Sequence, residues 1–222
     1  MLPTGSKETL AFWLRPDNGL GTLYAEVFWE PPECQHWCED EVEALFSGYL
    51  RDSVIIVAHV DNVNTMLEAP RRRCLGFAAA VPLTTSRPFG TTAQSTNAGT
   101  DPASAELVLD ASFFATYGID ASRAWYVADL GVCHSARRRG IASALLALAC
   151  NAAPLDALYS VLRVSSSKDY AIELYRRAGF TLLQGFVQHA FFHVQGADTP
   201  VPIQKHMMAK PLSGLSPVIN VA

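Results

Sequence analysis

The chain has 222 residues, and half of them are hydrophobic, which suffices for a large buried core. Its formal net charge of −4 argues against nonspecific binding to nucleic acid. No run of about 18 apolar residues is present to span a membrane, and the N-terminus lacks the basic-then-apolar pattern of a signal peptide. Five cysteines without a regular spacing favour reduced thiols and a cytoplasmic location.

The first elements in chain order are predicted from the apolar pattern and from the prolines. The stretch "ETLAFWLRP" predicts a strand over residues 8–16. A helical pattern follows over 20–50 and is broken at Pro31 and Pro32, because proline cannot continue a helix. Two apolar runs, "SVIIVAHV" and "CLGFAAAVPL", then predict strands.

A polar stretch at about 84–104, rich in Thr, Ser, Gly and Pro, interrupts the pattern. Structureless connections of this length are uncommon inside compact domains, so it is interpreted as a long loop or an insertion. We therefore expect a single domain over 1–222 that carries a polar insertion. The next stretch, 105–118, predicts a short helix.

Helices and strands alternate in the remaining third of the chain. Strands are predicted at 124–132, 158–165, 180–194 and 203–212, and helices from Gly140 onward and at 168–178. This alternation indicates an α/β fold with a mixed sheet.

Three arginines, Arg137 to Arg139, stand directly before the helix that begins at Gly140. The start of a helix carries positive partial charge, so cations there are disfavoured by ~0.3–1 kcal/mol each. No Asp or Glu lies between Asp129 and Asp156 to neutralise them. A bound anion would do so, because free N–H groups, the helix dipole and guanidinium groups together favour phosphate. The alternative is a solvated basic turn without a ligand.

Two motifs carry a resemblance to a known family. The stretch "RRRGIA", Arg137 to Ala142, resembles the [Q/R]-x-x-G-x-[G/A] signature of the GNAT superfamily of acyl-CoA-dependent N-acetyltransferases. Downstream, "SSSKDYAIELYRRAGF" is similar to the family's N-x-x-A-x-x-x-Y-x-x-x-G-F. The resemblance extends more loosely from about Ser53 to Leu212. It implies a mixed, strongly twisted sheet with flanking helices, splayed near Leu130 to Val132.

The resemblance also implies acetyl-CoA as co-substrate, without a metal, and a set of residues that bind it. Backbone groups of Leu130 and Val132, on either side of Gly131, would pair with the pantetheine chain. The pyrophosphate would lie on the turn and helix start, which comprise Arg137, Arg138, Arg139, Gly140, Ile141, Ala142 and Ser143. Lys168 stands where the family has asparagine, and a lysine can reach a phosphate instead.

Tyr175 is the first candidate for catalysis. With Ala171, Leu174 and Ala178 it falls on one face of the predicted helix, and Gly179 is a predicted helix stop. It is either a buried core residue or, as the resemblance implies, the phenol that protonates the leaving coenzyme A thiolate.

Asp129 is the second candidate for catalysis. It precedes the arginine-rich turn, and relatives often have a glutamate one residue earlier, where this chain has Ala128. Asp129 could accept the proton that an ammonium must lose before it attacks a thioester. The alternative is a structural hydrogen-bond acceptor, so the general base stays unassigned.

The acceptor is suggested by charge. Between Pro16 and Leu50 there are acids but no Lys or Arg, and an acidic wall would attract a cationic amine. The acids are Asp17, Glu26, Glu30, Glu33, Glu39, Asp40, Glu41 and Glu43. The alternative is a solvated acidic helix face. The spacing Cys34-x-His36-x-Cys38 is too tight for a usual zinc site.

These observations predict an N-acetyltransferase that moves an acetyl group from acetyl-CoA to a primary amine by direct attack in a ternary complex. The amine is a small cationic molecule or a protein amine, and no nucleic acid or membrane partner is expected. A homodimer remains open. Cys133 and His134 are interpreted as residues of the site wall. The alternative function is a catalytically silent acyl-CoA-binding sensor or interaction module.

Overall fold

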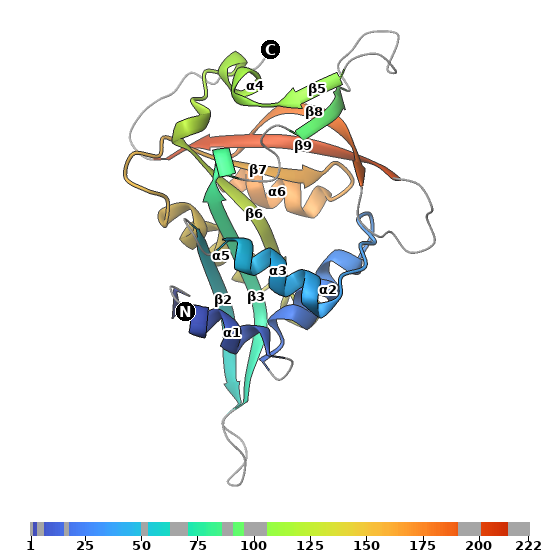
Figure 1. The fold of residues 1–222 in the computed structure, drawn as a ribbon, viewed down its shortest axis with the longest axis vertical. Coiled ribbons are helices and arrows are strands. Elements are labelled where there is room, and N and C mark those ends of the chain that lie inside the picture. Colours follow the sequence, from blue (N-terminus) through green and yellow to red (C-terminus); the bar gives the residue numbers. More distant parts are fainter. Residues whose placement is uncertain are drawn as a thin grey trace. The chain divides into compact units, whose positions relative to one another are not determined.

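The structure is a computed structural model that describes residues 2–3, 7–15, 18–49, 53–62, 71–85, 91–95, 106–190 and 201–212 (Figure 1). Asp17 and most of the polar stretch 84–104 lie outside these residues. The chain divides into two compact units. Unit 1 comprises Met1–Ala80 and Asp129–Ala152, and unit 2 comprises Val81–Ala128 and Ala153–Ala222. Each unit is described separately.

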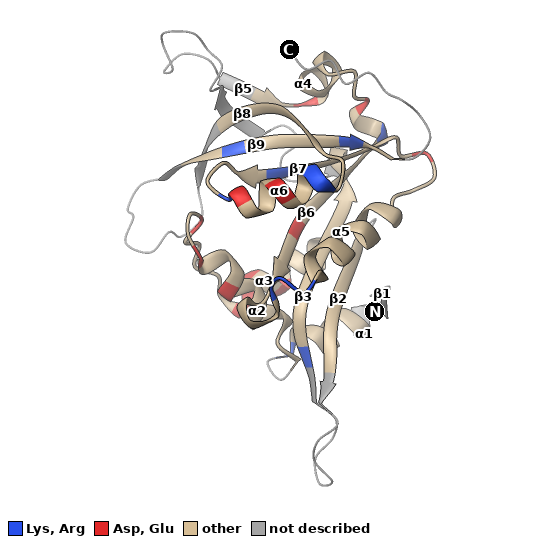
Figure 2. Ribbon diagram, turned by 180° about the vertical axis from the view of Figure 1, so that it is seen from behind, with Lys and Arg blue, Asp and Glu red and all other residues tan. Residues whose placement is uncertain are grey.

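Unit 1 is a sheet with helices on both faces. The strands β1 (Leu2–Pro3), β2 (Val54–Asn62) and β3 (Arg71–Pro82) pair antiparallel, and the end of β6 (Ala124–Val132) lies next to β3. The helices α1 (Lys7–Leu14), α2 (Leu20–Trp29) and α3 (Glu39–Tyr49) cover one face, and α5 (Ile141–Asn151) covers the other (Figures 1 and 2). Because both faces of β3 are covered, its residues Phe77 to Ala80 are all fully buried, as expected of a central strand.

The predicted strand at 8–16 is wrong, because residues 8–14 belong to helix α1. Leu10 and Trp13 are each only 2% exposed, and their spacing of three places both on one side of a helix. The helical pattern over 20–50 is confirmed as α2 and α3, separated by the segment that contains Pro31 and Pro32.

Unit 2 contains the mixed part of the sheet. The strands follow the order β6, β7 (Tyr159–Ser165), β9 (Val201–Pro211), β8 (Thr181–Ala190), β4 (Thr91–Ser95) and β5 (Glu106–Leu109). Only β6 and β7 pair in parallel among these described ladders. The helices are α4 (Ala111–Thr116), after β5, and α6 (Asp169–Arg177), between β7 and β8. The predicted mixed α/β fold with flanking helices is therefore confirmed.

Two predictions in unit 2 need correction. The helix predicted at 105–118 is a strand, β5, followed by the shorter helix α4. Asp110 separates them, because its carboxylate accepts the N–H groups of Ser112 and Phe113 and so caps α4. In the polar stretch, Thr91–Ser95 form strand β4, paired with β5 and β8, and are not loop. The strand predicted at 180–194 is β8 as far as Ala190, and its last residues lie outside the described ranges.

None of the helices in the described ranges combines the length and the apolarity that a bilayer crossing requires.

Candidate functional site

The turn before α5 has an unusual backbone. Arg138 and Gly140 both adopt left-handed conformations, with φ of 62° and 79°. Gly140 is the N-cap residue of α5, and it is exposed together with Arg138 and Arg139. Turns with left-handed residues gather successive N–H groups into concavities that bind anions.

The N–H groups at the start of α5 are available to a ligand. Among the described residues, the N–H groups of 138–143 donate no backbone hydrogen bond, and the first bond into the helix runs from Ala144 N to Gly140 O at 3.0 Å. A Cβ atom placed on Gly140 would meet no protein atom within 4 Å. The helix start is therefore open, and it carries the donors and the dipole that favour phosphate.

Arg137 differs from its two neighbours because its guanidinium group is already engaged. Its Nη2 lies 2.6 and 2.8 Å from the two carboxylate oxygens of Glu30, and its Nε donates to the Val132 carbonyl at 3.1 Å. The expectation that no acid neutralises Arg137 is wrong, since Glu30 comes from the end of α2, 107 residues away. The blue turn before α5 is visible in Figure 2. Arg137 thus ties the turn to α2.

The end of β6 holds the residues expected along the pantetheine chain. The ladder of β6 with β7 runs from Ala124 to Val127, so Leu130 and Val132 follow its end. The Val132 carbonyl accepts from Arg137, so this group is engaged. A Cβ on Gly131 would lie 2.5 Å from the Phe77 ring. Glycine at this position is therefore required by packing as well as matching the implied site.

Asp129 is held by two tyrosines. Tyr49 Oη donates to Asp129 Oδ2 at 2.7 Å, and Tyr24 Oη donates to Oδ1 at 3.3 Å. These two contacts agree with the interpretation of Asp129 as a structural hydrogen-bond acceptor. Asp129 is also half-buried and not sealed from solvent, which leaves a chemical role open.

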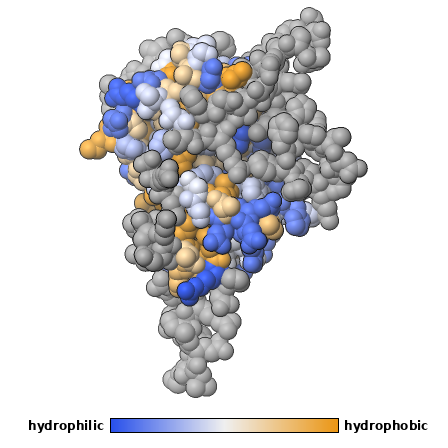
Figure 3. Space-filling view, viewed as in Figure 1, coloured by the Kyte–Doolittle hydropathy of each residue, from blue (hydrophilic) through white to orange (hydrophobic). Residues whose placement is uncertain are grey.

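The acids of the N-terminal third have several separate functions. Glu30 pairs with Arg137, Glu33 is only 4% exposed, and Glu41 accepts the N–H of Cys38 at the start of α3. Glu39 and Asp40, in the first turn of α3, are exposed and favoured there by the helix dipole. Figure 3 shows hydrophilic side chains gathered over α2 and α3. The N-terminal third is therefore acidic, but some of these acids stabilise the start of α3 or pair with Arg137.

Tyr175 lies in unit 2, near the end of α6, and is 8% exposed. The helix ends in a Schellman motif, because Gly179 N donates to Arg176 O and Phe180 N donates to Tyr175 O. Gly179 has φ of 88°, so the predicted helix stop is confirmed. The Phe180 ring packs on the Tyr175 ring with centroids 6.0 Å apart, which is the apolar contact that accompanies this motif. The Y-x-x-x-G-F pattern therefore fixes the tyrosine ring at the helix end.

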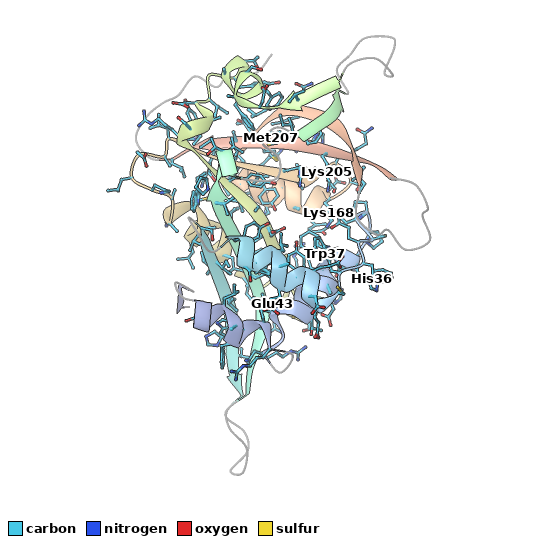
Figure 4. All side chains as sticks on the ribbon, viewed as in Figure 1. His36, Trp37, Glu43, Lys168, Lys205 and Met207 are labelled. Atoms are coloured by element: carbon cyan, nitrogen blue, oxygen red, sulfur yellow. The ribbon has the colours of Figure 1, made fainter. Side chains whose placement is uncertain are left out.

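Lys168 is the N-cap residue of α6 in unit 2, where its side chain makes no capping bond. Its N–H donates to the carbonyl of Ser165, whose hydroxyl accepts from Lys205 Nζ at 2.7 Å. Figure 4 shows Lys168 and Lys205 in this part of unit 2. Ser165 thus binds the ammonium group of Lys205 through its hydroxyl and the backbone of Lys168 through its carbonyl. Of the two lysines, only Lys168 is suggested by the sequence motif.

The cysteines give no support to covalent chemistry. Cys133 is 7% exposed, and its Sγ lies 3.2 Å from the Ser135 hydroxyl. Burial raises the pKa of Cys74 to about 12, which keeps that thiol protonated. Within the described ranges, no group of three or more His, Cys, Asp or Glu side chains is arranged to hold a metal ion.

Several contacts are not predicted from the sequence. Tyr24, Tyr49 and Glu30 contact residues 105, 80 and 107 positions away, and Lys205 contacts Ser165 from another strand. Tyr24 has a sequence signal only for burial, since it lies on the apolar face of α2 with Leu20, Leu23 and Val27. No local pattern indicates where its hydroxyl is directed.

Comparison with known proteins agrees with this geometry. Residues 104–180 match the model of the acetyltransferase (GNAT) family. No curated protein sequence matches the chain.

Solved structures with the same fold include a ribosomal-protein-alanine N-acetyltransferase from Brucella melitensis, at 15% identity, with 96% of this chain and 100% of that chain covered and a TM-score of 0.58. They also include Arabidopsis thaliana NAA60 in complex with a bisubstrate analogue, at 17% identity, 90% and 94% coverage and a TM-score of 0.55. The same protein in complex with acetyl-CoA matches at 16% identity, 89% and 94% coverage and a TM-score of 0.53. Residues 104–180 thus carry the sequence pattern of the GNAT acetyltransferase family, and the chain shares the fold of these solved structures.

Proposed function

We propose that this protein is an N-acetyltransferase that moves an acetyl group from acetyl-CoA to a primary amine within a ternary complex. The observation that carries the proposal is the start of α5, where exposed N–H groups without backbone partners in the described chain coincide with the family's R-x-x-G-x-A motif. One similar structure contains acetyl-CoA and another a bisubstrate analogue, which supports the same co-substrate here. The free state of all five cysteines supports a cytoplasmic location.

The pyrophosphate of coenzyme A would be held by the N–H groups of residues 139–143 and by the guanidinium groups of Arg138 and Arg139. Both arginines are exposed, and neither has a described acidic partner. Arg137 would act by shaping the turn, because Glu30 and Val132 already engage its guanidinium group. Lys168 is kept as a candidate contact to a phosphate on the basis of the sequence motif alone.

Acetyl-CoA supplies a thioester, and the residues of the chain would manage protons. Asp129 would take a proton from the ammonium group, which leaves a neutral amine with a lone pair. The amine attacks the thioester carbon, the C–N bond forms, and the C–S bond breaks. Tyr175 would donate a proton to the departing thiolate. The support for Tyr175 comes from its motif and from the rigid helix end that holds its ring.

Free-thiol release tests the proposal directly. Wild-type protein and acetyl-CoA are incubated with polyamines, aminoglycosides, amino acids and lysine peptides. We expect release that depends on one class of amine. Tyr175→Phe keeps the ring contact with Phe180, so acetyl-CoA affinity and thermal stability should hold while turnover falls by ~10²–10⁴-fold. A wild-type rate in this variant would return Tyr175 to a purely structural role.

The alternative is a silent acyl-CoA-binding module, and one observation favours it. Ala128 stands where relatives have a glutamate. Calorimetry with acetyl-CoA separates the possibilities. Tight binding without amine-stimulated thiol release across the panel would select the silent module, and absence of binding at millimolar ligand would contradict both.

A further inference from the structure

A carboxylate and two phenols from three different elements meet in unit 1. Asp129 of β6 accepts from Tyr49 of α3 at 2.7 Å and from Tyr24 of α2 at 3.3 Å. Each hydroxyl donates to a different carboxylate oxygen, so the plane of the carboxyl group is fixed from both sides. We refer to these three residues as the Asp129 cluster.

Strand alternation explains why the cluster forms. Side chains two residues apart on a strand share a face, so Asp129 and Gly131 face the same way. A Cβ on Gly131 would lie 2.5 Å from Phe77 and 3.2 Å from Val27 of α2. This is therefore the face of β6 that α2 covers, and Asp129 is directed toward the helices.

The surroundings of the cluster are aromatic. The centroid of the Tyr24 ring lies 4.5 to 5.4 Å from the centroids of four other rings, which belong to Phe28, Trp37, Phe46 and Phe77. Tyr24 is 2% exposed, whereas Asp129, Tyr49 and Trp37 are half-buried. The aromatic core thus makes Tyr24 a rigid support, while Asp129 and Tyr49 remain accessible from solvent.

A carboxylate next to aromatic rings is suited to an alkylammonium group. The negative charge pairs with the cation, and ring faces attract it further. A carboxylate has about four acceptor positions, so it can accept from two phenols and from an ammonium group at the same time. Hydroxyl or thiol acceptors would gain none of this charge pairing.

We propose that Tyr24 and Tyr49 are positioning residues, which hold the Asp129 carboxylate where it takes the proton of a primary alkylammonium acceptor. The proposal rests on the proposed acetyl transfer and adds to it two positioning residues, Tyr24 and Tyr49. In the step itself, one N–H bond of the ammonium group breaks and an O–H bond forms on Asp129. The electron pair left on nitrogen then attacks the thioester carbon.

Binding is tested first, without acetyl-CoA. Protein labelled with ¹³C at the ζ carbon of tyrosine is titrated with ethylammonium chloride, and sodium chloride controls for ionic strength. We expect the resonances of Tyr24 and Tyr49, assigned with Tyr24→Phe and Tyr49→Phe, to shift in wild-type protein and to stay constant in Asp129→Asn. Unshifted wild-type resonances at high millimolar ethylammonium would overturn the proposal.

Kinetics then separate positioning from general stability. Ethylamine is protonated at neutral pH, whereas 2,2,2-trifluoroethylamine is mostly neutral and needs no base. Tyr49→Phe should reduce the rate with ethylamine roughly tenfold to a hundredfold, as expected for loss of a hydrogen bond to a charged group, and should change the rate with trifluoroethylamine less than about threefold. Equal losses with both amines would assign Tyr49 a structural role only.

A matched control is available in the other unit. The Tyr159 hydroxyl donates to the Gly118 carbonyl at 3.0 Å within unit 2, so Tyr159→Phe removes a tyrosine hydrogen bond that does not involve Asp129. This variant should lose thermal stability without discriminating between the two amines. Discrimination by Tyr159→Phe as well would overturn the assignment to the Asp129 cluster.

The experiments distinguish failure of this inference from failure of the proposed function. Thiol release by wild-type protein that Tyr49→Phe and Asp129→Asn leave unchanged would retain the transferase and overturn the cluster. Tyrosine shifts with ethylammonium, in a protein that releases no thiol with any amine, would support the ammonium site and contradict acetyl transfer.

Discussion

Replacing Gly140 with alanine separates a phosphate-binding turn from a merely solvated one. In the structure, a Cβ on Gly140 meets no protein atom within 4 Å, so a methyl group there fits the free protein. If the pyrophosphate lies against the N–H groups of the turn, the methyl group would stand in its way. The variant should therefore weaken binding of acetyl-CoA.

Gly19 provides the matched control. It is the N-cap residue of α2, with φ of 76°, as Gly140 with φ of 79° is that of α5, and a Cβ on it also meets nothing within 4 Å. Alanine at positive φ costs roughly 1–2 kcal/mol, partly offset by ~0.4–1 kcal/mol from the less flexible unfolded chain. Both variants should lose roughly 1 kcal/mol of stability, which lowers Tm by about 2–4 °C in a chain of this size.

Coenzyme affinity should distinguish the two variants. Loss of hydrogen bonds to a charged group costs roughly 1.5–3 kcal/mol, which corresponds to a roughly tenfold to hundredfold rise in Kd. Calorimetry with acetyl-CoA should find this rise in Gly140→Ala and an unchanged Kd in Gly19→Ala. Unchanged affinity in both would refute the phosphate site, and equal weakening in both would show that the effect is transmitted through stability.

Three further predictions concern contacts that the structure adds. In urea unfolding, Arg137→Gln and Glu30→Gln should each lower the free energy of unfolding by up to about 1 kcal/mol, since the two side chains are 29% and 33% exposed. The double variant should lose little more than either single variant, and fully additive losses would mean that the two groups are independent. Gly131→Ala should lower the free energy of unfolding by about 1–3 kcal/mol, because the added methyl group clashes with the Phe77 ring. Phe77→Leu in the same chain should recover part of that loss, whereas additive losses of the two substitutions would contradict the clash. Burial, with Arg176 as a second cause, lowers the pKa of His206 below 6.5, so the unfolded chain takes up a proton that the folded chain resists and stability falls as the pH drops through about 6.5. Urea unfolding at about pH 7.5 and about pH 5.5 should show a smaller difference for His206→Gln than for wild type, and an equal difference would exclude His206 as the cause.

Local sequence patterns determined most of the elements that carry the family motifs. Apolar runs and alternation predicted β2, β3, β6 and β7, and the spacing of Ala171, Leu174 and Tyr175 predicted helix α6. The residues that α6 buries are Tyr175, as predicted, and Ile172, which the predicted face did not include. The motif around Gly140 indicated both the helix start and the co-substrate class. These features depend on residues within a few positions of one another, which is why they can be predicted without the fold.

The errors arose where the local sequence was compatible with two structures and tertiary contacts selected one. The apolar residues of "ETLAFWL" are compatible with the alternation of a strand and with the spacing of a helix. Only the burial of both Leu10 and Trp13 selects the helix. β4 has a polar sequence typical of a loop, and it is a strand because β5 and β8 supply hydrogen bonds on both sides. Asp110 divides β5 from α4 through a cap that depends on the orientation of one carboxylate.

Only the tertiary structure decided the partners of the charged and polar groups. The sequence presented Arg137 as an unneutralised cation and Asp129 as a carboxylate with an open role. Folding brings Glu30 to the first, across 107 residues, and Tyr24 and Tyr49 to the second, across 105 and 80 residues. A hydrogen bond depends on distance and angle and not on spacing along the chain, so no local pattern encodes such a pair. The sequence determined which ionisable and hydrogen-bonding groups the chain contains, and the fold decided which of them pair with one another.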